Sequence, residues 1–237
     1  MKILSYFFAL FTMTFVTTAC AQNISGNGEV VEENRSVESF SSIDIGGVLN
    51  VYLTQGDTES VTVEADENLL DLITTENRGS TLVVKLKKGV DIKKAKEKNV
   101  YITLRSIDAL EVGGVVNVKS TNALTADAFD LDIGGVSNTD LELRCDRLNA
   151  QADMVGNLTL RGEVREANIK NGGVGSLKAF DLKVDRLTIK NSGVGSAEVQ
   201  AQEEISITSS GVGSVRYKGD PVVKELSTSG VGKVKKI

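Results

Sequence analysis

The chain has 237 residues, a formal net charge of −5 and a sequence pI near 5.0, so it offers no basic footprint for nucleic acid. Aromatic residues make up only 5% of the chain, which predicts a core of Val, Ile, Leu and Ala in thin β layers. His is absent, and with it the commonest general base and metal ligand, so neither a cofactor nor a catalytic residue is predicted.

Residues 1–21 are predicted to be a secretory signal peptide, because a basic Lys2 precedes a short apolar stretch and a group of small residues. Two cleavage sites fit. A small-x-small site would release a soluble chain that begins at Gln22. A lipobox-like sequence would instead make Cys20 the lipidated N-terminus, although Thr17 stands where that pattern has Leu. Either route predicts export to the periplasm, the outer-membrane surface or the medium, with membrane contact only through such a lipid anchor.

The next segments are predicted from composition and alternation. Residues 22–38 are polar and are expected to be a flexible tether. Residues 39–110 are expected to form a mixed β layer that caps the first edge of the coils, with a short amphipathic helix at 67–76 and an exposed charged loop at 87–98. Residues 111–237 are expected to form regular coils, and together 39–237 would be a single domain.

A repeat of about 19 residues runs through the C-terminal part. Its anchor is a valine, and after a first gap of 67 residues the spacings are 21, 19, 19, 20, 18 and 19. The anchors are Val48, Val115, Val136, Val155, Val174, Val194, Val212 and Val231. Apolar residues at every second position around each anchor give the period of a strand, so we expect coils of short strands stacked in parallel at about 4.8 Å.

Two columns of small or polar residues lie close to the anchor valines in the sequence. The residue before the anchor is glycine in seven coils, which predicts structural corners at Gly47, Gly114, Gly135, Gly173, Gly193, Gly211 and Gly230. Two residues after the anchor, the first coils carry asparagine. We expect a structural ladder of stacked side-chain amides at Asn50, Asn117, Asn138 and Asn157.

One outward column is acidic. Four residues before the anchor it begins with Asp44, Glu111 and Asp132 and continues with Gln151 and Lys170. Stacked carboxylates could hold Ca²⁺ or act as an acid/base pair, so these three are weak candidates for a metal or catalytic site. The simpler interpretation is a solvated β face. Cys145 lies in an apolar column and is expected to be a core thiol.

A family resemblance rests on two segments, SGNGEVVEENRSVESFSSIDIGGVLNVYLTQGD (residues 25–57) and SGVGSVRYKGDP (residues 210–221). They resemble the head GIN domain family, secreted Bacteroidetes proteins described as auto-transporter adhesins, and the similarity spans about residues 25–232. The literal GIN is absent, and GGVLN is the nearest string. The resemblance implies a right-handed parallel β-helix (a β-solenoid) on the cell envelope and brings no catalytic residues.

Three functions are compatible with these patterns. The first is an exported, non-enzymatic adhesin that binds a surface glycan or protein through a side face. The second is a carbohydrate-active enzyme that uses the acidic column. The third is a purely structural envelope protein.

Overall fold

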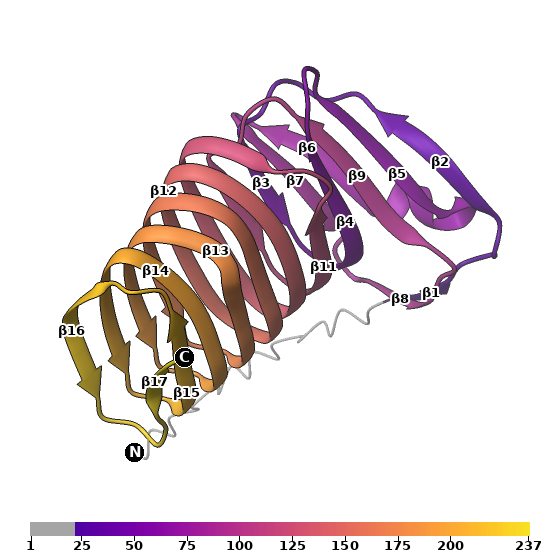
Figure 1. Cartoon of the computed structure of the whole chain (residues 1–237). Coiled ribbons are helices and arrows are strands. Elements are labelled where there is room, and N and C mark those ends of the chain that lie inside the picture. Colours follow the sequence, from indigo (N-terminus) through magenta and orange to yellow (C-terminus); the bar gives the residue numbers. More distant parts are fainter. Residues whose placement is uncertain (1–21) are drawn as a thin grey trace, which may run out of the picture.

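The computed structural model describes residues 22–237, which form β-structure almost throughout. Figure 1 shows a column of stacked turns that continues, at the N-terminal side, into a layer of separate strands. Fifteen strands belong to one sheet, and β1 (Gln22–Ser25) and β8 (Val90–Lys94) form a small second sheet. Within residues 22–237, no helix is long and apolar enough to cross a lipid bilayer.

The N-terminal part contains short strands and one helical turn. Its elements are β2 (Val30–Arg35), β3 (Ser42–Ile45), β4 (Val48–Gln55), β5 (Ser60–Asp66), the 3₁₀ helix η1 (Glu67–Leu72), β6 (Ile73–Arg78), β7 (Thr81–Leu86) and β9 (Lys98–Leu104). The coils follow as β10 (Ala109–Val112), β11 (Val115–Ser120), β12 (Leu124–Asn171), β13 (Val174–Asn191), β14 (Val194–Ser209), β15 (Val212–Lys218), β16 (Val222–Thr228) and β17 (Val234–Lys236).

The anchor valines set the register of the coils. Val155 on β12 lies opposite Val174 on β13, and Val174 lies opposite Val194 on β14, in parallel pairing. β12, β13 and β14 are unusually long because hydrogen bonding to the neighbouring coil continues through the bends. The repeat seen in the sequence therefore places equivalent residues side by side.

The expected fold class, a right-handed parallel β-helix, is wrong, although the chain is all-β. β9 pairs in parallel with β4 but antiparallel with β5, and β5 pairs antiparallel with β2. β6 and β7 form another antiparallel pair, joined by a tight turn in which Gly79 has a φ of 61°. The described residues thus form one mixed sheet that curls around a shared interior. The N-terminal strands are members of this sheet and are not a separate cap.

The segment expected to be a flexible tether, residues 22–38, is instead part of the β-structure. β1 pairs with β8, and β2 pairs with β5. The fully buried Asp66 fixes this arrangement, because its carboxylate accepts the backbone N–H of Gly28 at 2.6 Å and of Lys96 at 2.7 Å. These backbone hydrogen bonds outweigh the effect of burial, and the pKa of Asp66 lies below its usual value. The predicted signal peptide, including Cys20, lies outside the described residues.

Two smaller predictions for this region were also wrong. The helix expected at 67–76 is only the 3₁₀ turn η1, after which the chain enters β6. The loop expected at 87–98 contains strand β8, which β1 pairs with in parallel. β8 forms because the distant strand β1 pairs with it, whereas β6 forms a local hairpin with β7, so strand pairing decides the local structure in both places.

Aliphatic columns fill the interior of the coils. Leu158, Leu177, Ala197 and Val215 stack in register, and each is at most 1% exposed. Burying one such large aliphatic side chain contributes about 1.5–3 kcal/mol, whereas ordering a residue's backbone costs about 1–2 kcal/mol. A single coil therefore cannot fold alone, and the stack is the folding unit.

The corner glycines serve two physical purposes. Gly47, Gly114 and Gly135 have positive φ angles of 105°, 85° and 69°, which favour glycine. The later glycines of the column, Gly173, Gly193, Gly211 and Gly230, have no positive φ, but a Cβ atom there would lie 2.0–2.2 Å from the backbone carbonyl of the preceding coil. In these later coils glycine is required because the coils approach each other closely, and not because of the backbone conformation.

Candidate binding groove

The outward column brings three acidic side chains together on neighbouring strands. Glu111 on β10 lies opposite Asp44 on β3 and opposite Asp132 on β12, both in parallel register. Asp44 is half-buried and accepts a hydrogen bond from the Lys85 ammonium at 2.6 Å, whereas Glu111 and Asp132 are exposed. The carboxylates thus form an outward row with one end neutralised by lysine.

This row lies in a groove of about 490 Å³ across β3, β10 and three successive coils of β12, which we call the acidic groove. Asn149 donates to Asp130 at 2.9 Å and so orders part of its wall. Gln151 and Lys170 continue the groove, which therefore changes from acidic to basic along the column. Its polar lining consists of Ser42, Asp44, Thr81, Glu111, Asp130, Asp132, Asn149, Gln151, Asn168 and Lys170.

The acidic groove does not contain a metal site in this geometry. In the part of the chain that the structure describes, no three His, Cys, Asp or Glu side chains come close enough together to hold a metal ion. Asp44, Glu111 and Asp132 are neighbours along a row and do not converge on one point, since parallel strands keep them about 4.8 Å apart. What the row can do is present hydrogen-bond acceptors at regular intervals.

The asparagine side chains form a directional amide ladder on another face. Each Nδ2 donates a hydrogen bond to the Oδ1 of the next asparagine in the ladder. The donor–acceptor distances are 3.0 Å for Asn157 to Asn138, 3.2 Å for Asn138 to Asn117, 2.9 Å for Asn117 to Asn50 and 3.0 Å for Asn50 to Asn99. Asn99 then donates to Glu64 at 2.8 Å and to Glu97 at 3.0 Å. Asn99 is the member that sequence reasoning missed, because it lies inside the 67-residue gap of the repeat.

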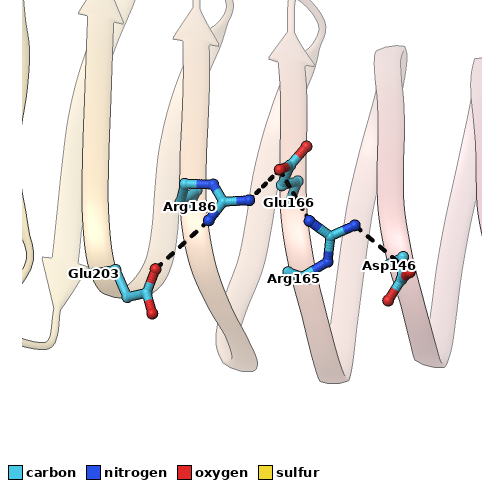
Figure 2. Close-up of polar contacts among 5 residues, drawn as sticks. All are labelled: Asp146, Arg165, Glu166, Arg186 and Glu203. Atoms are coloured by element: carbon cyan, nitrogen blue, oxygen red, sulfur yellow. Dashed lines mark hydrogen bonds and ion pairs between the residues drawn. The ribbon is translucent and has the colours of Figure 1, made fainter.

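A chain of ion pairs crosses four coils beside the acidic groove, and sequence reasoning did not find it. Figure 2 shows Arg165 between Asp146 and Glu166, at 3.5 Å and 3.1 Å, and Arg186 between Glu166 and Glu203, the latter at 3.7 Å. The hydrogen bond from Arg186 holds the pKa of Glu166 below its usual value. A signal existed, because charges of opposite sign recur at the repeat spacing. These exposed pairs each contribute little stability.

Two potentially reactive side chains, Tyr101 and Cys145, have surroundings that raise their pKa values. The rings of Tyr52 and Tyr101 stack with centroids 5.1 Å apart, and the Tyr101 hydroxyl donates to Glu64 at 2.7 Å. That hydrogen bond, with burial, raises the pKa of Tyr101 to about 12. Burial, and secondly the charge of Asp146, raises the pKa of the half-buried Cys145 thiol to about 11. A thiol in this state is a poor nucleophile at neutral pH.

The fold and the groove define the class: an all-β protein whose curled mixed sheet has a polar, hollowed outer face. Residues 39–221 match the family model described as "Putative auto-transporter adhesin, head GIN domain". The chain belongs to this family, which confirms the resemblance seen in the sequence. No curated protein matches the chain.

Solved structures agree with this assignment. The chain is similar to a putative adhesin from Bacteroides fragilis, with 32% identity and a TM-score of 0.87 over 90% of this chain and 100% of that chain. A putative adhesin from Parabacteroides distasonis has 24% identity and a TM-score of 0.70, and covers 91% of this chain and 100% of its own. A putative lipid binding protein from the same species has 22% identity and a TM-score of 0.73, with 91% and 100% covered. The last two show the fold alone.

Proposed function

We propose that this protein is an exported, non-enzymatic adhesin that binds a surface glycan along the acidic groove. Membership of a family described as adhesins supports a role in attachment rather than catalysis. The apolar leader at residues 1–21 supports export to the periplasm, the outer-membrane surface or the medium. The groove supplies the hollowed polar face on which the proposal rests.

The single observation that carries the proposal is the regular spacing of hydrogen-bonding groups in the groove. Asp44, Glu111, Asp132, Gln151 and Lys170 come from successive strands in one column. Parallel strands repeat every 4.8 Å or so, which gives a row of acceptors and donors suited to a linear polymer rich in hydroxyl groups. Carboxylates and amides accept hydrogen bonds from sugar hydroxyls, and the Lys170 ammonium donates to their oxygens.

A glycan-array screen of purified residues 22–237, with and without Ca²⁺, tests this function. Each glycan that binds is then titrated against the groove variant Asp132→Asn and the control variant Asp185→Asn. Asp185 lies on a different hollow of the surface, so its substitution changes the charge equally without touching the groove. The proposal expects a roughly tenfold loss of affinity for Asp132→Asn and no change for Asp185→Asn, since a hydrogen bond to a charged group typically contributes about 1.5–3 kcal/mol and one to a neutral group about 0.5–1.5 kcal/mol.

The same screen discriminates the other functions. Cleavage of a bound glycan that disappears in Asp132→Asn would replace the adhesin with a carbohydrate-active enzyme that uses the row of carboxylates. Binding that survives Asp132→Asn would move the site away from the groove. Silence on every glycan would refute glycan binding and favour a protein partner or a structural role in the envelope.

A further inference from the structure

The mixed sheet has open edges at both ends of the column. One path of paired strands runs from β17 to β2, and the second runs from β16 through β14 and β3 to β6. In the described part of the chain, each of these four terminal strands pairs on one side only. Figure 1 places β16 and β17 at one end of the column and β2 at the other. Unpaired strand edges are ready templates for another strand.

The C-terminal end also exposes the interior of the stack. Val223 pairs with the fully buried Ile205 and Leu226 with the fully buried Ile207, so both continue inward columns. Nevertheless Val223 is 42% exposed and Leu226 is 56% exposed, because no described coil lies beyond them. Repeat proteins usually cover such an end with a polar capping unit. This end instead presents apolar side chains beside open strand edges.

The two ends carry opposite charge. Residues 222–237 contain four lysines and one glutamate, a net of +3 from side chains, whereas residues 22–38 contain four glutamates and one arginine, a net of −3. Two of the lysines, Lys233 and Lys235, form no ion pair within residues 22–237, and the same holds for Glu29 and Glu32. These groups are therefore available to a partner.

We propose that copies of this chain associate head to tail, with the C-terminal end of one copy docked on the N-terminal layer of the next. A second copy is the partner that matches both the open edge and the charge of this end, because its opposite end has an open edge and the complementary charge. Contact between two equivalent ends would place lysine against lysine or glutamate against glutamate. The head-to-tail contact is heterologous, so association continues beyond a dimer into open chains.

Sedimentation velocity of purified residues 22–237, which hold every described strand, tests the proposal over a range of protein concentrations. We expect species larger than dimers at 20 mM NaCl, and an association constant at least about tenfold weaker at 500 mM NaCl, where screening is nearly complete. A protein that stays monomeric at low salt, or one whose association stops at a dimer, would overturn it.

Charge reversal then identifies the surfaces. Lys233→Glu/Lys235→Glu and Glu29→Lys/Glu32→Lys should each abolish self-association, whereas Lys178→Glu/Lys190→Glu on a middle coil should leave it unchanged. Mixing the first two variants should restore association, because an acidic C-terminal end then meets a basic N-terminal layer. Far-UV circular dichroism checks that every variant keeps the β fold. Failure of the mixture to associate, with folded variants, would exclude the head-to-tail contact.

Discussion

Gly195→Ala tests whether close approach of the coils limits the stability of the column. Gly195 lies opposite Gly175 in the next coil, and a Cβ atom added to it would lie 1.8 Å from the Gly175 carbonyl oxygen. Ordinary van der Waals contact begins at 3.4 Å, so the two coils would have to separate by the difference, 1.6 Å. That movement weakens the interstrand hydrogen bonds on either side of the corner.

The expected cost follows from two contributions. The φ of Gly195 is 143°, a conformation that costs an alanine about 1–2 kcal/mol. Two weakened backbone hydrogen bonds add about 0.5–1.5 kcal/mol each. We therefore expect Gly195→Ala to lower the free energy of unfolding by about 2–5 kcal/mol, measured as a lower urea midpoint at unchanged slope.

Gly89→Ala is the matched control. Gly89 also has a positive φ, 77°, but an added Cβ would meet nothing within 4 Å, so this variant reports backbone strain without a collision. It should cost only about 1 kcal/mol. If Gly195→Ala were no more destabilising than Gly89→Ala, the corners would be able to open, and the steric reasoning given for the whole glycine column would be refuted.

Three further predictions concern polar groups. Asn117→Ala removes two hydrogen bonds of the amide ladder and should lower the free energy of unfolding by about 1–2 kcal/mol in urea titration. An effect below about 0.5 kcal/mol would mean that water replaces the ladder at no cost. Tyr101 should ionise near pH 12 in ultraviolet titration, and Glu64→Gln should bring its pKa towards 10, whereas an unchanged titration in the variant would assign the shift to burial. Because the pKa of Tyr101 is higher in the folded state, its hydrogen bond to Glu64 stabilises the fold below pH 10, and this stabilisation is lost as the pH rises to 12. Cys145 should react with a disulfide reagent at pH 8 more than about tenfold faster in urea than in the native protein, and Asp146→Asn should speed the native reaction only slightly; equal rates in both states would contradict the burial argument.

The sequence repeat allowed the neighbouring residues of successive coils to be predicted. A column that recurs every 19 or so residues identifies which residues become neighbours, and so the positions of Asp44, Glu111 and Asp132 in one row follow from spacing alone. That the row lies in a hollow does not follow, because concavity depends on how the strands of successive coils bend.

The wrong predictions concern segments whose partners are distant and not repeated. Apolar and polar residues alternate in the same way in parallel and antiparallel strands. The antiparallel pairing of β5 with β2 and β9 therefore could not be predicted from this alternation. Residues 22–38 seemed too polar to be ordered, yet the carboxylate of Asp66, 38 positions away from Gly28, supplies the backbone contact that orders them. Asn99 was missed for the same reason, since its place beside Asn50 results from tertiary pairing.

The corners described above also determine how the protein can change in length. The coils of β13, β14 and β15 meet through the same small contacts, glycine against glycine, so these coils are interchangeable at that point. Gain or loss of one whole repeat would keep all columns aligned and would only lengthen or shorten the rod. A single inserted residue would instead turn alternate side chains inside out along the rest of its strand. Length changes inside a strand are therefore restricted to whole coils, whereas the differences between coils of 18 to 21 residues are accommodated where the register shifts, as between Ala179 and Val184.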